Sequence, residues 1–468
     1  MPDQRPVTSS WAKKLLEIAA IGCALFPQTA WAQAKPILIQ PEVQYQRFDG
    51  FGITLGNGAA KEIMGLPERE RTRLMDWLFG SEGTHFNLIR NEITWAAKRL
   101  PMTHPLFLRG LRFYFVDEEN ETGQFNLLRE AQKRNEVIPY SCAWSPPPLW
   151  KTNQSENDGG ELMANHCEDF AFYLGAYIDF YKKLRFLEIP FLSFQNNPKG
   201  AGPFQSCLWN PGQTKEFLKL VARQFKVQGI HTQLMLPELD WGPLAEFLDP
   251  ILADPEARQW VSAIAAHSYT GENKDRVKIK EIYKRLNVKL WQTEFALPST
   301  EHSSGLDGGL RLAEQIINDL LYSECQAWFY WVPLASPQWK DRTALLDRGA
   351  NSFKLTKRFW CLAQFSRFIS NNSVRILVSG GTSQVIAFRN PGYTAIALVL
   401  INSLNEPVTE TIQTRNWNLE RLAAYRTSQE EDCSVVPVPG ESGSKLSLTL
   451  TPRSVTTLTA QIRRLPSR

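Results

Sequence analysis

Short hydrophobic runs that end abruptly in polar side chains recur along the middle of the chain. The run 189–194 stops at amide side chains and Pro198, and the run 288–293 stops at Glu294. A continuous hydrophobic run of this length, followed by turn residues, is typical of a buried parallel strand whose carboxyl end opens into a loop.

Runs of this kind alternate with segments of helical periodicity. We expect strands in the glycine-rich segment from residue 48 and at 86–90, 137–143, 189–194, 233–237, 264–269, 288–294 and 327–331. We expect helices at 67–79, 117–134, 169–184, 214–228, 278–285, 309–323 and 354–366. Eight strand–helix units predict an α/β fold, a (β/α)8 TIM barrel over residues 48–370.

The pattern changes from about Val374 onward. Short alternating segments at 384–388, 394–401, 446–450 and 454–459 are separated by Gly, Pro, Asn and Ser turns. They predict an all-β sandwich as a side domain over residues 371–468. The β-prone segment within residues 33–47 is expected to pair with that domain, because an unpaired hydrophobic strand favours aggregation.

The first 32 residues have the pattern of a cleavable signal peptide. Arg5, Lys13 and Lys14 precede an apolar stretch over 15–26, and Ala30 and Ala32 supply the small residues of a cleavage site. The apolar stretch is too short to span a bilayer. We therefore expect a secreted or periplasmic protein with no stable membrane insertion after the signal is removed.

Composition narrows the functional classes. The chain has 468 residues, 43% of them hydrophobic and 21% charged, with a net charge of +4. This fits a folded protein and gives no support for a nucleic-acid partner. The cysteines show no CxxC spacing and the histidines no HExxH, so we expect no metal and no cofactor. We also expect a monomer.

Polar or aromatic residues stand at most of the expected strand ends, where TIM barrels carry their chemistry. They are Arg90, Trp144, Asn196, Asn197, Glu238, His267, Tyr269, Glu294 and Trp331. Carboxylates, amides that bind hydroxyl groups and aromatic floors suit the cleavage of glycosides. From composition alone this remains one of several barrel chemistries.

A set of short motifs, spread in order over nearly the whole chain after the signal, makes the prediction more specific. The motifs are FDGFG (48–52), WSPP (144–147), KTN (151–153), QNNP (195–198), HSY (267–269), TE (293–294), FSRFI (365–369), YRTS (425–428) and PRSVTT (452–457). Together they resemble glycoside hydrolase family 30, which includes glucosylceramidases, β-glucosidases and glucuronoxylanases.

The resemblance implies a retaining mechanism and assigns roles. Glu294 falls on the position of the nucleophile, and Asn196 on that of the asparagine that contacts the sugar 2-hydroxyl. Substrate-binding positions that line the subsite of the cleaved sugar fall on Arg90, Trp144, Tyr269 and Trp331. Each has a structural alternative: Arg90 neutralises Glu294, the two tryptophans pack at the rim, and His267 is either a buried core histidine or a ligand contact.

The chain departs from the family pattern at Asn197, where the family has a glutamate that acts as general acid and base. An amide has no titratable proton for either role. Three hypotheses follow: a weak or degenerate glycosidase, an enzyme in which Glu238 supplies the proton, or an altered version of an active enzyme.

We therefore predict an exported retaining β-glycoside hydrolase of the glucosylceramidase or xylanase type, impaired through Asn197. Its partner is expected to be a β-linked carbohydrate or glycolipid substrate. The alternative is a catalytically degenerate carbohydrate-binding protein that keeps the cleft.

Overall fold

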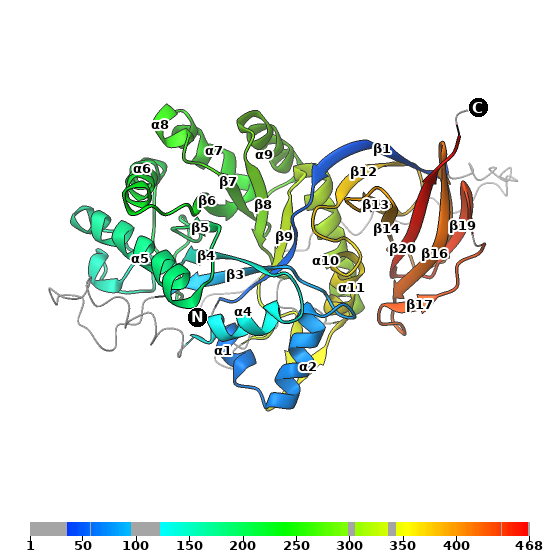
Figure 1. The fold of residues 1–468 in the computed structure, drawn as a ribbon, viewed down its shortest axis with the longest axis horizontal. Helices are drawn as coiled ribbons and strands as arrows, with labels where there is room; N and C mark the ends of the chain where they lie inside the picture. Colours follow the sequence, from blue (N-terminus) through cyan, green and yellow to red (C-terminus); the bar gives the residue numbers. More distant parts are fainter. Residues whose placement is uncertain are drawn as a thin grey trace, which may run out of the picture. The chain divides into compact units, whose positions relative to one another are not determined.

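The computed structural model describes residues 35–56, 58–94, 122–297, 305–335, 343–440 and 442–466. The predicted signal peptide and residues 117–121 of one predicted helix lie outside them. Within the described residues, eight parallel strands close into a barrel in chain order, which confirms the predicted TIM barrel (Figure 1). The strands are β2 (Gly50–Thr54), β3 (Leu88–Ile93), β4 (Ile138–Ala143), β5 (Phe191–Ser193), β6 (Gln233–Asp240), β7 (Ala263–His267), β8 (Lys289–Glu294) and β9 (Ala327–Tyr330).

Helices surround this barrel, as Figure 1 shows. They are α1 (Ala59–Met64), α2 (Glu68–Phe79), α4 (Gln124–Gln132), α5 (Cys167–Arg185), α6 (Pro211–Gln228), α7 (Trp241–Leu252), α8 (Pro255–Arg258), α9 (Asn273–Leu286), α10 (Leu306–Asn318) and α11 (Lys357–Ser366). Short helical turns lie at η1 (Pro148–Trp150), η2 (Ala164–His166) and η3 (Asp319–Ser323), the last a π-helix that continues α10. A two-stranded hairpin, β10 (Leu346–Arg348) and β11 (Phe353–Leu355), precedes α11.

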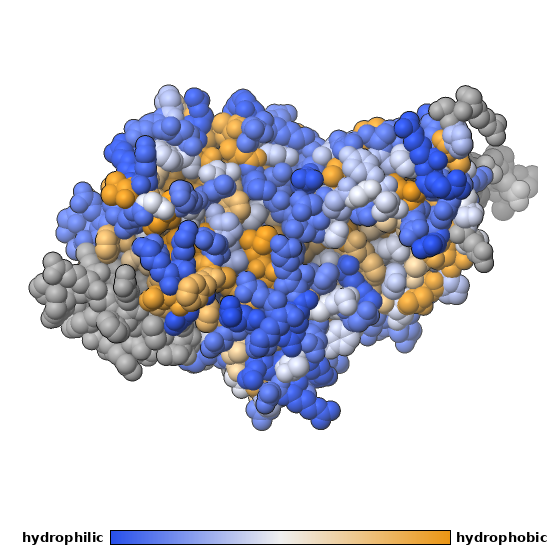
Figure 2. All heavy atoms as spheres, in the orientation of Figure 1, coloured by the Kyte–Doolittle hydropathy of each residue, from blue (hydrophilic) through white to orange (hydrophobic). Residues whose placement is uncertain are grey.

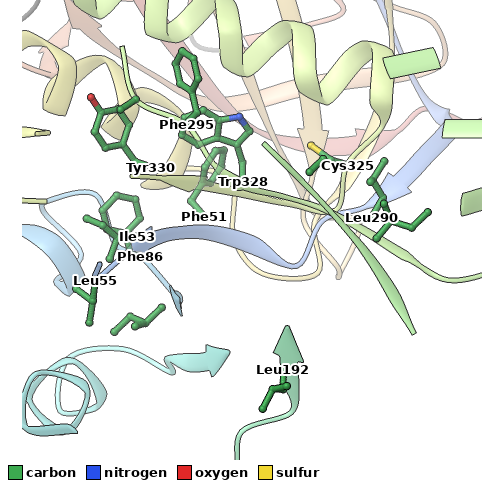
Figure 3. Close-up of a cluster of buried hydrophobic side chains, with 14 of the residues drawn as sticks. Phe51, Ile53, Leu55, Phe86, Leu192, Leu290, Phe295, Cys325, Trp328 and Tyr330 are labelled. Carbon is green, nitrogen blue, oxygen red and sulfur yellow. The ribbon is translucent and has the colours of Figure 1, made fainter. Parts of the chain in front are cut away.

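Side-chain alternation in β2 shows how the barrel is filled. Phe51 and Ile53 belong to the large core shared with the helices, where they lie near Trp328 and Tyr330 of β9 (Figure 3). Gly52 lies between them in sequence, and a Cβ atom there would come within 2.4 Å of the Phe329 ring. Glycine is therefore required at residue 52, because the barrel interior is already filled by side chains of the neighbouring strands.

Some helices differ from their predicted bounds for identifiable reasons. Helix α9 begins five residues before the predicted start, at a capping box formed by Glu272 and Asp275. Helix α7 was not predicted, and it contains Pro243 and Pro250, which obscure a helical pattern in the sequence.

The C-terminal domain is all β, as predicted, and its sheet is mostly antiparallel. The order is β17-β16-β20-β14-β13-β12-β1-β15-β19, with β18 paired to β16. The strands are β12 (Val374–Ser379), β13 (Gln384–Arg389), β14 (Ala395–Asn402), β15 (Val408–Thr414), β16 (Trp417–Thr427), β17 (Ser434–Val436), β18 (Ser442–Gly443), β19 (Lys445–Leu450) and β20 (Ser454–Arg464). The N-terminal strand β1 (Ile37–Arg47) pairs antiparallel with β12 and parallel with β15, so it completes this sheet.

Helices α10 and α11 pack against each other, and both contact strands of the C-terminal sheet (Figure 1). Buried Gln364 of α11 donates to Thr427 and accepts from Thr457, which are residues of β16 and β20. On the face shown in Figure 2, hydrophilic residues dominate, with small hydrophobic areas between them. No helix in the described part of the chain is both long and apolar enough to cross a membrane.

Candidate active site at the carboxyl end of the barrel

The guanidinium of Arg90 forms the centre of the site. Arg90 lies on β3 with 0% of its surface exposed. It donates to Glu294 Oε2 at 2.6 Å, to Asn196 Oδ1 at 2.6 Å and to Glu238 Oε2 at 3.1 Å. Burial opposes the positive charge, but the two carboxylates raise the pKa of Arg90 well above its usual value. The buried Arg90 thus forms hydrogen bonds to residues at or just after the ends of β5, β6 and β8.

The carboxylate of Glu294 is held at both oxygens. Arg90 contacts Oε2, and the hydroxyl of Tyr269 donates to Oε1 at 3.0 Å. A register irregularity between β7 and β8 places Glu294 opposite His267. Such an irregularity re-aims a side chain at the end of a strand. The residue remains 7% exposed, so a small part of it is accessible to a ligand.

Glu238 is a second carboxylate of the site, and it is fully buried. It accepts from Thr293 Oγ1 at 2.6 Å and from the hydroxyl of Tyr140 at 3.3 Å, in addition to Arg90. Burial opposes ionisation, but Arg90, His267 and Thr293 together lower the pKa of Glu238 to about 2. In this arrangement Glu238 is fully buried and Arg90 favours its ionised form, so its carboxylate does not reach a ligand as the structure stands.

His267 lies beneath these two carboxylates and is 2% exposed. Its Nε2 atom is 3.4 Å from Glu238 and 3.8 Å from Glu294. The side chain therefore belongs to the buried polar cluster, and its Nε2 atom lies close to both carboxylates without a hydrogen-bond partner among the described residues.

The predicted aromatic residues lie together beside the charged cluster. The rings of Trp144 and Trp331 have centroids 6.1 Å apart, and the guanidinium of Arg90 lies 4.4 Å from the Trp144 ring. Gly56 lies against both rings: a Cβ atom there would come within 2.6 Å of Trp331. The glycine-rich segment thus makes room for these rings.

Asn197 lies in the loop that follows β5. Its backbone N–H donates to the carbonyl oxygen of Glu238 at 3.0 Å, and its φ of 43° is in the left-handed region, which asparagine tolerates. Its half-buried side chain packs against Gly200, where a Cβ atom would come within 2.3 Å of Asn197 Nδ2. The structure therefore brings Asn197 to the same end of the barrel as Glu294.

The sequence did not identify the roles of several buried residues that form hydrogen bonds within or near the charged cluster. Tyr140 and Thr293 are interior to predicted strands, and only the alternation of the strands hints that they face inward. Buried Asp319, in the π-helix η3, accepts from Ser268 at 2.8 Å and from Arg276 Nε at 2.8 Å. It also accepts from the indoles of Trp241 and Trp328. No motif in the sequence marks this residue, although π-helices are frequent at functional sites.

The part of the chain that the structure describes holds no group of three His, Cys, Asp or Glu residues able to bind a metal ion. The cysteines in that part, Cys142, Cys167, Cys207, Cys325, Cys361 and Cys433, are all free.

Comparisons with known proteins agree with this geometry. Residues 48–369 match the model of the glycosyl hydrolase family 30 TIM-barrel domain. The lysosomal acid glucosylceramidase of Mus musculus is 26% identical over 411 residues, which cover 80% of this chain and 79% of that protein.

Two solved structures share the fold. The catalytic domain of xylanase C from Talaromyces cellulolyticus has a TM-score of 0.75 at 22% identity, covering 91% of this chain and 100% of that one. An endo-β-1,6-glucanase has a TM-score of 0.73 at 19% identity, covering 91% and 94%. The family match spans more than half of the residues and includes every strand of the barrel. The chain therefore belongs to glycosyl hydrolase family 30.

Proposed function

We propose that this chain acts on β-glycosides by a retaining, double-displacement route with Glu294 as the nucleophile. The observation that carries the proposal is the way Arg90 and Tyr269 hold one oxygen each of the Glu294 carboxylate. Two donors thus fix the orientation of the carboxylate at the end of β8. Retaining glycosidases need an oriented carboxylate of this kind to attack the anomeric carbon.

We propose that Asn196 recognises a sugar hydroxyl. Arg90 is only a donor, so the Oδ1 atom of Asn196 must face it, as the 2.6 Å contact shows. The amide NH2 group is then left to donate to a ligand. Trp144 and Trp331 supply an aromatic surface beside it, which suits the apolar face of a sugar ring.

The substrate class follows from the relatives. A glucosylceramidase, a xylanase and an endo-β-1,6-glucanase are among the proteins similar to this chain, and all three names denote enzymes that act on glycosides. We propose a β-linked sugar, either a glucoside, a glucosylceramide-like lipid or a xylan, with no cofactor. We also propose that the signal at residues 1–32 is removed and that the mature chain is a secreted or periplasmic monomer.

Asn197 limits this activity. A general acid or base contributes typically about 10²–10⁴ in rate, and an amide provides neither function. Glycosides with poor leaving groups are therefore expected to react slowly. The same observation favours the second candidate function, a carbohydrate-binding protein that keeps the cleft without turnover.

The test is covalent trapping. The full chain is incubated with fluorinated β-glucosyl and β-xylosyl fluorides. Their sugars form long-lived glycosyl-enzymes, and their leaving group, fluoride, departs without protonation. We expect a label on the peptide that contains Glu294, and no label in Glu294→Gln. Asn197→Glu is expected to gain about 10²–10⁴ in rate on poor leaving groups. Saturable sugar binding with no label and no product, unchanged in Glu294→Gln, would instead support the binding protein.

A further inference from the structure

The segment that leaves β7 carries side chains that alternate between the site and the helices outside the barrel. His267 and Tyr269 face the site, where the Tyr269 hydroxyl donates to Glu294 Oε1 at 3.0 Å. Ser268, which stands between them, donates instead to Asp319 in η3. Tyr269 is 43% exposed, so its position depends on how the chain around it is held.

Asp319 is the first anchor of this segment. Its fully buried carboxylate accepts from Ser268 Oγ at 2.8 Å and from Arg276 Nε at 2.8 Å. Ser268 Oγ in turn accepts from Gln315 Nε2 at 2.8 Å. Asp319, Ser268 and Arg276 are all buried and bonded to one another, and a satisfied buried network of this kind holds its members rigidly.

Asp319 also reaches the ring of Tyr269 by a second route. Trp328 Nε1 donates to Asp319 Oδ2 at 2.9 Å. Phe295 packs beside Trp328, with ring centroids 6.1 Å apart (Figure 3), and beside Tyr269, with centroids 5.9 Å apart. Since Phe295 directly follows Glu294 in the chain, the same contacts also support the end of β8.

Asp240 is the second anchor. It stands at the N-cap of α7, where an aspartate normally accepts from its own helix. Within α7, which the structure describes completely, its side chain accepts from no backbone N–H. It accepts instead from the backbone N–H groups of Tyr269 at 2.9 Å and Thr270 at 3.3 Å. Next to them, a Cβ atom at Gly271 would come within 2.7 Å of Trp241, so the segment after β7 lies directly against the start of α7.

We propose, as an extension that rests on Glu294 acting as the nucleophile, that Asp240 and Asp319 are positioning residues for the reaction. They hold residues 268–270 at two points and thereby fix where the Tyr269 hydroxyl lies. That hydroxyl holds one oxygen of the nucleophile, so a displaced segment leaves the carboxylate free to turn away from the anomeric carbon.

The experiment measures how fast Glu294 is labelled by the fluorinated β-glucosyl or β-xylosyl fluoride that labels the parent. Ser268→Ala removes the link to Asp319, and Asp240→Ala removes the acceptor for the two N–H groups. We expect each variant to lower the maximal labelling rate about 5- to 100-fold, because a misplacement of about 1 Å can cost about 10²-fold. The half-saturating concentration is expected to stay within about twofold. Asp240 is only half-buried, so Asp240→Ala decides the question if Ser268→Ala does not fold.

The Tyr269→Phe background separates positioning from a general weakening of the fold. Once the hydroxyl is absent, there is nothing left for the two aspartates to position. Ser268→Ala and Asp240→Ala are therefore expected to change the labelling rate by less than about twofold in that background, a strong departure from additivity. Ser454→Ala removes a buried serine hydroxyl from the C-terminal sheet and is expected to be labelled like the parent.

Three results would overturn the inference. Labelling of Ser268→Ala and Asp240→Ala at the parent rate would show that neither anchor matters to the reaction. Slowing by the same factor with and without the Tyr269 hydroxyl would show that the anchors do not act through it. Both of these results would leave Glu294 as the nucleophile, whereas absence of a label on Glu294 in the parent would remove the proposed function and this inference together.

Discussion

Glu238→Gln is the sharpest test of the charged cluster, because it changes one atom type in a fully buried side chain. In the parent, every hydrogen-bond partner of the Glu238 carboxylate that the structure shows is a donor: Arg90, Thr293 and Tyr140. A glutamine would direct an NH2 group at donors and leave part of the charge of Arg90 uncompensated. Breaking one side of a buried ion pair costs about 3–5 kcal/mol.

The pKa of Glu238 gives an independent magnitude. It is lowered from 4.5 to about 2, and one pKa unit corresponds to about 1.4 kcal/mol. Because the folded-state pKa lies below the unfolded one, the stabilisation of about 3 kcal/mol is fully present above pH 4.5. It is lost as the pH falls from 4.5 through 2.

The assay is urea unfolding, followed by tryptophan fluorescence, at a series of pH values from 7 downwards for as long as both proteins are folded. The free-energy difference between the parent and Glu238→Gln is expected to be constant above pH 5 and to shrink below pH 4.5. Glu281→Gln, on the exposed face of α9, controls for the loss of one negative charge. A difference that stays constant down to pH 3 would refute the assignment of Glu238 as a buried anion.

Three further predictions concern single contacts. Tyr269→Phe removes only the hydrogen bond to Glu294 Oε1 and is expected to slow trapping of the glycosyl-enzyme about 10- to 150-fold, with little change in the thermal midpoint; an unchanged trapping rate would contradict it. Asp319→Asn leaves buried Arg276 without its counter-charge and is expected to cost about 3–5 kcal/mol in urea unfolding; a loss below about 1 kcal/mol would show that the ion pair is dispensable. Thr293→Val removes a donor to Glu238 and is expected to lower the free energy of unfolding by about 1.5–3 kcal/mol, a change measurable in the same way.

The sequence was sufficient to predict the barrel and which strand ends carry polar residues. Runs rich in hydrophobic residues, such as 189–194, determine both, because a strand buried on both faces is predominantly apolar until it leaves the barrel. The contacts between those ends were harder to predict. Register irregularities near Glu238 and Glu294 re-aim both side chains, and neither irregularity has a signature in the sequence.

Hydrogen-bond networks between distant parts of the chain were also not predictable from the sequence. Asp319 accepts from donors of α7, α9 and the end of β7, which are 43 to 78 residues away in sequence, as well as from nearby Trp328 of β9. In the sequence, Asp319 is one acidic residue within a helical pattern. Its role depends on which elements the fold brings together, so it becomes visible only in three dimensions. The burial of Glu238 was likewise not predictable, because the sequence shows only that it stands at a strand end.

Strand β1 has a consequence for the order in which the protein is made. It lies between β12 and β15 in the C-terminal sheet, and its pairing joins Arg47 to Val374. At a synthesis rate of about 5–20 residues per second, β1 waits roughly 15–65 seconds after it is made before its first partner exists. During that time its hydrophobic residues Ile37 and Ile39, buried in the finished protein, have no sheet to join. The barrel is synthesised in this interval, so β1 must be shielded, by a chaperone or by the growing chain, until the last fifth of the protein emerges.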